Sequence, residues 1–454
     1  MHVKMKAPKP LTIVIKLGTS SIVDERTHEP LLSILTMIVE TAVKLHKDGH
    51  KVIIVSSGAI GVGLRRMGLN KRPKHLPRIQ ALAAIGQCRL ISLWDSLFGY
   101  FNQPVAQILL TRNDIADRTQ YLNAQNTFAE LLEMGVIPIV NENDTIAVTE
   151  IKFGDNDTLS AITAAMVHAD YLFLMTDVDC LFDKNPRTHP GAQPIEVVED
   201  IGALQADVSS AGSALGTGGM STKIVAARLA TSAGVTTVIT RSSNPGNIAN
   251  IVGYVQNLKT SSASLPSTPP SGKTISSSSA SFEEPLARSA ASLELKAEAP
   301  LHTRFIPSSQ PIRDRYFWLL HGLAPHGTVY IDSGAHRALC NKAGLLPVGV
   351  VDVEGTFAQQ EAVRLVVVDR IPKSTLQYDT GEGVAVKLWE GPGIEVGRAL
   401  VNYSAAEIMR IKGVRSCEIQ RLLGYAESEY VALRENISFF VRESRPVTPT
   451  SEVR

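Results

Sequence analysis

The sequence has little cysteine, almost no net charge and no long apolar run, and each absence excludes a class of protein. Its four cysteines include no C-x-x-C pair, which argues against a disulfide framework or a cysteine-held metal site. The formal net charge of +1 excludes a chain-wide attraction to nucleic acid or anionic membranes. No apolar run approaches the roughly 20 residues of a membrane span, and none opens the chain as a secretory signal would. We therefore expect a cytoplasmic protein that binds no membrane and holds no metal site of its own.

Short apolar runs alternate with longer helical patterns over residues 1–257. The runs within 11–17, 51–58 and 171–179 are nearly continuous in apolar residues, which is typical of parallel strands buried on both faces. The alternation predicts a three-layer αβα sandwich around a mostly parallel sheet. Polar residues follow several of these runs directly, and ligands of such sheets bind beyond the carboxyl ends of the strands.

The rest of the chain divides into two regions of different composition. Residues 258–307 include a stretch from Ser261 to Pro300 with twelve serines, which buries too little apolar surface to order itself and predicts a disordered linker. Residues 308–445 contain strand-like segments with frequent glycines, which predict a small β-rich barrel domain. Because the candidate chemical residues all precede residue 224, we expect a chain ending near residue 257 to fold and remain active.

Two glycine-rich turns, each next to a lysine, are the strongest chemical signals. VIKLGTSS (14–21) contains Lys16, and GTGGMSTK (216–223) contains Lys223 at the start of a predicted helix. Glycine lets backbone N–H groups approach an anion closely, and lysine adds a compact positive charge. Two such turns can close on one polyphosphate, which is what phosphoryl transfer requires. Alone, Lys16 is also compatible with a solvated lysine at a strand end.

Four other segments are weaker signals, and each has more than one interpretation. VSSGAIGVG (55–63) suits close approach of a substrate to the main chain near Ser57, or close helix packing through glycine. The Asn- and Asp-rich segments 141–146 and 152–161 suit a substrate ammonium group, or an Asx-rich turn with Asp157 or Thr158 as a helix N-cap. Asp157 also suits the orientation of a lysine. The step from Thr176 to Asp177 suits hydrogen bonds to a nucleotide, or a surface turn.

With these motifs in order along the chain, the sequence resembles the glutamate 5-kinases of the amino acid kinase superfamily. Further matching segments are LAAIGQ (82–87), QILLTRND (107–114) and LMTDVDCLF (174–182). The distal part, with GTVYIDSGAHRAL and LLGY, resembles the PUA domain that many members carry. The serine-rich insertion and the lengthened distal domain resemble fungal forms.

The resemblance implies ATP-dependent phosphorylation of the side-chain carboxylate of L-glutamate, with Mg²⁺, as the first step of proline biosynthesis. It implies catalytic roles for Lys16, Lys223 and Asp157, and glutamate binding by Ser57, Asp144 and Asn156. It implies ATP binding by Lys16, Thr176, Asp177, Thr217, Gly218, Gly219, Met220, Ser221, Thr222 and Lys223.

The partners implied by the resemblance are L-glutamate, ATP, L-proline as feedback inhibitor, further copies of the chain in a homo-oligomer, and glutamate-5-semialdehyde dehydrogenase as recipient of the product. Two alternatives stay open. One is a sister kinase acting on another acidic amino acid, and the other is an RNA-binding regulator that uses the PUA-like domain.

Overall fold

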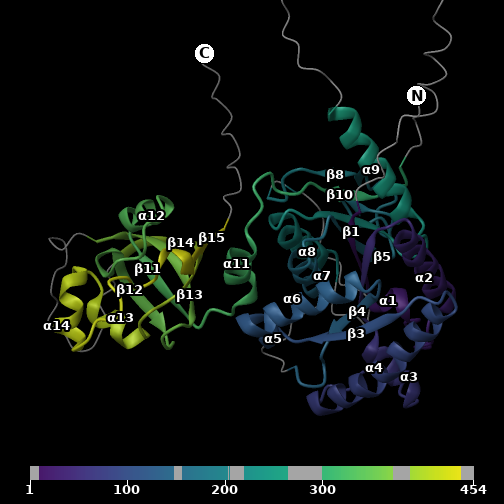
Figure 1. Cartoon of the computed structure of the whole chain (residues 1–454), viewed down its shortest axis with the longest axis horizontal. Coiled ribbons are helices and arrows are strands. Elements are labelled where there is room, and N and C mark those ends of the chain that lie inside the picture. The colour runs from purple at the N-terminus through teal and green to yellow at the C-terminus, as the bar shows by residue number, and fades with distance from the viewer. Residues whose placement is uncertain are drawn as a thin grey trace, which may run out of the picture.

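The computed structural model of the chain describes residues 10–147, 156–202, 204, 219–263, 299–371 and 389–440, which form two domains (Figure 1). The elements of the first domain are β1 (Thr12–Leu17), α1 (Thr19–Ile22), α2 (Leu32–Lys47), β2 (Lys51–Ser56), α3 (Ala59–Arg66), α4 (Leu76–Gly99), β3 (Val105–Leu110), α5 (Arg112–Ala116), α6 (Arg118–Glu133), β4 (Ile137–Glu142), α7 (Asn156–Met166), β5 (Tyr171–Thr176), β6 (Leu181–Phe182), β7 (Pro194–Ile195), β8 (Val197–Val198), α8 (Met220–Ser232), β9 (Thr236–Arg241), α9 (Asn247–Ala263), β10 (Thr303–Phe305), α11 (Asp314–Phe317) and the π-helical segment η1 (Trp318–Gly322).

The elements of the second domain are β11 (Gly327–Ile331), α12 (Ser333–Cys340), η2 (Pro347–Gly349), β12 (Val350–Gly355), β13 (Ala362–Arg370), β14 (Trp389–Leu400), α13 (Ala405–Ile411), η4 (Ser416–Glu418), α14 (Ile419–Leu423), η5 (Arg434–Asn436) and β15 (Ile437–Phe439). In the described ranges, no helix combines the length and the hydropathy that a bilayer crossing requires.

The large sheet of the first domain has the order β3-β4-β2-β1-β5-β9-β10-β8. The six strands from β3 to β9 run parallel, which confirms the mostly parallel sheet expected from the apolar runs. In register, Leu17 at the end of β1 lies beside Ser56 of β2 and Met175 of β5. The carboxyl ends of these three strands therefore meet at one edge of the sheet.

Helices cover both faces of this sheet, as the three-layer prediction requires. Side chains of a strand alternate between faces, so Ile13 and Ile15 of β1 pack into the core beneath α2, α4 and α9. Val14 points to the opposite core, which contains side chains of α6, α7 and α8. Lys16 has the same parity as Val14, so its side chain enters the layer of α7 and α8.

The first domain extends beyond residue 257, which corrects the expected boundaries. α9 runs to Ala263, and β10 pairs with β9 and β8 in the large sheet. Farther along, the N–H groups of Ser308 and Ile312 donate to carbonyls at the end of α8. The segments 258–263 and 303–305 are therefore ordered secondary structure, not linker. The remainder of the predicted linker from 264 to 298 lies outside the described residues.

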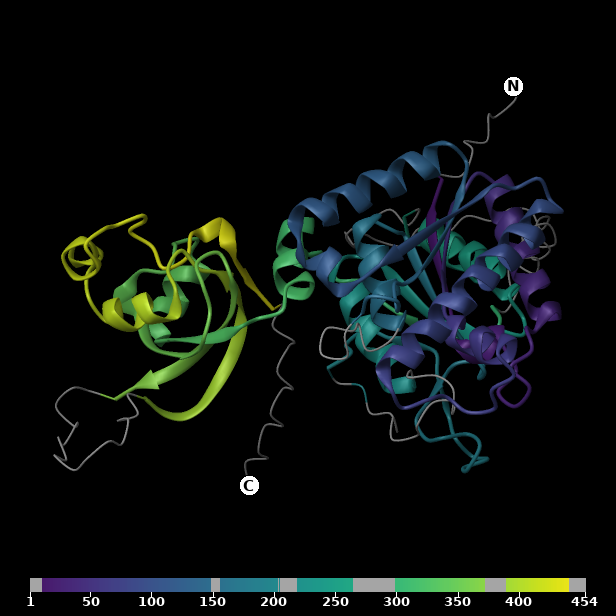
Figure 2. The same ribbon diagram turned by 90° about the horizontal axis from the view of Figure 1, so that it is seen from below.

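The second domain is a five-stranded sheet of order β12-β11-β13-β14-β15. All of its pairings are antiparallel except that of β11 with β13. Its own apolar core includes Val329, Leu365, Tyr403 and Ile411, so the domain has the separate β-rich core that its composition predicts. Figure 2 shows it as a body apart, reached through the green segment that contains α11 and η1.

Candidate functional site

The centre of the candidate site is a buried carboxylate between two lysines. Asp157, in the first turn of α7, is fully buried and forms ion pairs with Lys16 Nζ through Oδ1 and with Lys223 Nζ through Oδ2, the latter at 3.4 Å. Lys16 comes from β1 and Lys223 from the first turn of α8. The structure thus brings together, at one edge of the sheet, three residues whose motifs are spread over about 200 positions of the chain.

Thr222 fixes the geometry of this group from α8. Its hydroxyl donates to Asp157 Oδ2 at 2.7 Å and accepts from the N–H of Gly219 at 3.0 Å. Gly219 is the N-cap of α8, and Met220 and Ser221 are its first two residues. The end of the glycine-rich segment is therefore fastened to the carboxylate that pairs with both lysines. Thr217 and Gly218 lie outside the described residues.

The ionisation of Asp157 is set by two opposing effects. Burial alone raises the pKa of a carboxyl group, but the charges of Lys16 and Lys223 and the hydrogen bonds from Lys16 and Thr222 lower the pKa of Asp157 to about 2. The carboxylate is therefore ionised at neutral pH and keeps both lysines close together. Among the described residues, the carboxylate that pairs with both ammonium groups is Asp157, and two lysines at one sheet edge suit phosphate oxygens.

A chain of side-chain amides lies beside the lysines. Asn156 Nδ2 donates to Ser57 Oγ and to Asn141 Oδ1, each at 2.9 Å. Asn141 Nδ2 in turn donates to Gln87 Oε1 at 2.8 Å. These hydrogen bonds determine the orientation of each side-chain amide. They leave Asn156 Oδ1 buried without a hydrogen-bond partner. A buried acceptor with no donor suits a ligand that brings an N–H group.

Asn141 and Gln87 were not among the individual residues assigned from the sequence. Asn141 is the next-to-last residue of β4 and Gln87 lies in the middle of α4, 54 positions away along the chain. The motif segments LAAIGQ and VNEND contain both residues, but the spacing of these segments does not show that the two side chains meet. Asp144 lies half-buried in the turn that follows β4, three residues beyond Asn141.

The glycines of the segment 55–63 have two roles, at different positions. One glycine shapes the turn near Ser57, and another allows two helices to pack closely. Gly58 has a φ of +100° and caps α3, so it makes the turn after Ser57. A Cβ on Gly63 would lie 2.1 Å from the carbonyl of Leu82, and one on Gly86 would lie 1.7 Å from that of Ala59. Gly63 and Gly86 therefore serve the close packing of α3 on α4.

The N-cap interpretation of Asp157 and Thr158 is wrong, because α7 already begins at Asn156.

The second group of predicted ligands lies at the end of β5. Thr176 is buried and its hydroxyl donates to Asp177 Oδ1 at 3.1 Å. Asp177 forms an ion pair with Arg187, and both side chains are more than half exposed. The carbonyl of Thr176 accepts from Ser242 N–H just beyond β9. These groups lie at the carboxyl end of β5. Because β5 lies between β1 and β9 in the sheet, they are on the β9 side of the end of β1.

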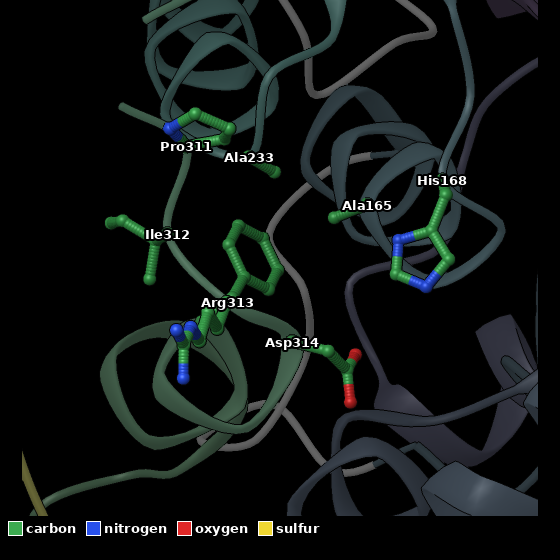
Figure 3. A pocket seen from close by; sticks show the side chains of 8 residues that line it. Ala165, His168, Ala233, Pro311, Ile312, Arg313 and Asp314 are labelled. Carbon is green, nitrogen blue, oxygen red and sulfur yellow. The ribbon is translucent and has the colours of Figure 1, made fainter. Parts of the chain in front are cut away.

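A cavity of about 240 Å³ lies away from these residues. Its walls come from Ala165 in the last turn of α7, His168 just after α7, Ala233 after α8, and the segment from Pro311 to Phe317 (Figure 3). α7 and α8 start at the lysine–aspartate group and end at this cavity, so the cavity is at the opposite ends of the same two helices. It contains none of the predicted site residues.

Two family models match the chain, one for each domain. The amino acid kinase family matches residues 11–241, and the PUA domain matches residues 327–423. A probable glutamate 5-kinase of Schizosaccharomyces pombe is 52% identical over 94% of this chain and 93% of its own length. An uncharacterized protein of Saccharomyces cerevisiae is 46% identical over 95% of this chain and 99% of its own. A glutamate 5-kinase of a Cyanothece strain is 44% identical over 94% and 98%, respectively.

Proposed function

The chain belongs to the glutamate 5-kinases of the amino acid kinase family, and we propose that its lysine–aspartate group transfers the γ-phosphate of ATP to the side-chain carboxylate of L-glutamate. The product is L-glutamyl 5-phosphate, the first intermediate of proline biosynthesis. The observation that supports the site is the fully buried Asp157 between Lys16 and Lys223 at the carboxyl edge of the sheet. Ligands of such sheets bind at this edge.

The reaction needs alignment and charge neutralisation more than it needs a base. The side-chain carboxylate of glutamate is ionised at neutral pH, so an oxygen of that group attacks the γ-phosphorus directly and the bond to the ADP oxygen breaks. Negative charge on the transferring group is stabilised by Lys16 and Lys223. Asp157 keeps both ammonium groups in position without touching the reacting atoms, so it is a positioning residue.

The amide chain supports recognition of the amino-acid end of glutamate. Asn156 Oδ1 is the buried acceptor without a partner, and it suits an N–H of the α-ammonium group. Asp144 follows Asn141 by three residues in the turn after β4 and would add a carboxylate for the ammonium group. Ser57 Oγ accepts from the Asn156 amide nitrogen at 2.9 Å. A substrate whose nitrogen is acetylated presents one donor and no charge, so we expect it to bind poorly.

ATP is assigned to the other side of the lysines. Thr176 and Asp177 supply hydrogen-bonding groups for the nucleoside, and the N–H groups at the start of α8 suit phosphate oxygens. No group of three His, Cys, Asp or Glu side chains within the described ranges is placed to hold a metal ion. Mg²⁺ would enter with ATP and would supply further neutralisation of the phosphate charge.

A parallel assay of three acceptors tests this function. Purified protein receives Mg²⁺-ATP with L-glutamate, L-aspartate or N-acetyl-L-glutamate, and hydroxylamine traps any acyl phosphate as a hydroxamate. We expect hydroxamate and ADP in equal amounts with L-glutamate and far less with the other two. Preferred turnover of aspartate or N-acetylglutamate would assign the chain to a sister activity, and ADP without hydroxamate would contradict transfer to a carboxylate.

Regulation and assembly are further proposals that rest on the family. L-Proline has the α-carboxylate and cationic nitrogen of glutamate, so we expect it to compete with glutamate for Asp144 and Asn156. An enzyme indifferent to millimolar proline would refute this. A homo-oligomer, and transfer of the reactive acyl phosphate to glutamate-5-semialdehyde dehydrogenase, are tested by light scattering and by co-sedimentation of the two enzymes.

A further inference from the structure

Two arginines of the second domain face each other across neighbouring strands. In the antiparallel register of β13 and β14, Arg364 is directly opposite Arg398, so the two side chains project from the same face of the sheet. Like charges at such positions repel. Arg364 is exposed, and its side chain has no hydrogen bond or ion pair within the part of the chain that the structure describes. An anion between the two guanidinium groups would remove this repulsion.

Arg398 reaches from its strand to the boundary with the first domain. Its Nη1 donates to the carbonyl of Leu323, directly after η1, at 2.7 Å. Its Nε is buried and has no hydrogen-bond partner, although an unpaired buried donor is unfavourable. The guanidinium is thus held in place by one hydrogen bond while another donor is left unused.

A third arginine comes from the first domain. α5 begins at Arg112 and packs against η1, where Trp318 Nε1 donates to the carbonyl of Ile115 at 2.9 Å. Arg112 is half-buried, and no hydrogen bond or ion pair of its side chain occurs in the described ranges. Burial lowers the pKa of the Arg112 guanidinium.

The charges around Arg398 are mostly of one sign. Burial has the largest effect and lowers the pKa of Arg398; the Glu395 carboxylate comes next and raises it, and Arg112 and Arg364 then lower it. Glu395 is exposed and forms no ion pair with any of the three arginines in the described ranges. The cluster is therefore short of negative charge at a point where both domains contribute.

We propose that Arg112, Arg364 and Arg398 form a site for a small phosphate-bearing anion at the boundary between the two domains. Guanidinium groups match phosphate oxygens with paired N–H donors, and three of them suit a group of more than one negative charge. A nucleic-acid backbone fits less well, because residues 326–440 contain 12 Lys and Arg against 14 Asp and Glu, a net charge of −2 that repels a polyanion.

An anion at this site would connect the second domain to the turn after β4, which contains Asp144 and is assigned to glutamate binding. Arg112 lies two residues after Leu110, whose carbonyl accepts from the N–H of Asn143 at 2.9 Å. Asn143 begins the turn that contains Asp144. An anion bound by Arg112 of the first domain and by Arg364 and Arg398 of the second therefore limits the movement of one domain relative to the other. It also limits the movement of the end of β3, to which the turn with Asp144 is hydrogen-bonded.

Calorimetric titration of the full chain with inorganic phosphate tests the site. A non-hydrolysable ATP analogue and L-glutamate are present at saturation, so that the phosphoryl-transfer site is occupied. The variants are Arg364→Gln and Arg112→Gln, and the matched control is Arg337→Gln, which changes an exposed arginine of α12 that also lacks a partner. Circular dichroism verifies that each variant is folded.

We expect one phosphate per chain for the wild type and the control, and binding about tenfold or more weaker in the two other variants, because each loses hydrogen bonds to a charged group. Equal affinity in all four proteins would overturn the site, as would an equal loss in the control, which would indicate general charge attraction. A structured RNA that binds through Arg364 while phosphate does not would also overturn it.

Discussion

Two groups of paired charges, one in each domain, lie in opposite environments. In the first, Asp157 is 0% exposed, and the side chains of Lys16 and Lys223 are 4% and 9% exposed. In the second, Lys412 and Asp352 pair at 2.7 Å with side chains that are 22% and 27% exposed. Burying a charge costs several kcal/mol of desolvation free energy, and the attraction of its ion-pair partners offsets about the same amount. A partly exposed pair costs and gains little, about 0–1 kcal/mol.

This difference indicates why each group is present. Folding alone gains little from two buried lysines on one carboxylate, because apolar side chains of similar size would pack as well. The cluster is best explained by chemistry that needs positive charge in a site shielded from water. The pair in the second domain needs no such explanation, since it is compatible with an ordinary surface contact.

The largest effect is expected from the place where the first domain is cut. A chain ending at residue 257 loses β10, and with it Phe305, Phe317 and Trp318, which belong to the core between the sheet and α7 and α8. We expect it to fail to fold, whereas a chain ending at residue 324 keeps these elements, folds and phosphorylates glutamate. Circular dichroism and urea unfolding of both chains measure this, and cooperative unfolding of the shorter one would restore the boundary at 257.

The next effect is on catalysis by the lysines. Lys223→Ala removes positive charge that acts on the transferring phosphoryl group, so we expect kcat to fall by about 10²–10³ or more, with a much smaller change in the KM for glutamate. Lys412→Ala is the control and should leave kcat unchanged. Steady-state kinetics of both variants measure these changes. A near-normal kcat in Lys223→Ala would contradict a role of Lys223 in phosphoryl transfer.

How far the sequence predicts the site depends on whether each residue lies in a local motif that can be recognised by itself. Lys16, Asp157 and Lys223 were recognisable because each lies beside a glycine-rich or Asx-rich turn at a strand or helix end. The contact of Gln87 with Asn141 was not, because it joins the middle of α4 to the end of β4. The strand β10 was missed for a similar reason, since three residues have no periodicity and their pairing with β9 and β8 defines them.

The buried carboxylate also predicts acid sensitivity. The pKa of Asp157 is lowered from 3.8 to about 2 in the folded chain, so its ionised form stabilises the fold fully above about pH 4. That contribution, about 2 kcal/mol from a shift of about two units, is lost as the pH falls through about 2. Urea unfolding between pH 5 and pH 2 measures it against Asp157→Asn. A stability difference that does not narrow toward low pH would contradict the assignment.

The smallest effect is expected at the amide chain. Gln87→Leu removes the acceptor that fixes how the Asn141 amide is turned, and through it the orientation of Asn156. We expect the KM for glutamate to rise about tenfold, the size of one lost hydrogen bond to a charged system, with kcat within about twofold. Gln125→Leu is the matched control, because it loses a 2.8 Å bond to the carbonyl of Met166 at the far end of α7. Equal changes in the two variants would show that Gln87 acts only on stability.

The most direct test of the central claim follows one oxygen atom. L-Glutamate labelled with ¹⁸O in its side-chain carboxylate is incubated with the protein, Mg²⁺-ATP and hydroxylamine, and the released phosphate is analysed by mass spectrometry. Attack of the carboxylate on the γ-phosphorus makes a labelled oxygen the bridge to phosphorus, and hydroxylamine then attacks the carbonyl carbon, so each phosphate should contain one ¹⁸O. Unlabelled phosphate, formed at the same rate as ADP, would mean that water is the acceptor and would contradict the assignment of this site to glutamate phosphorylation.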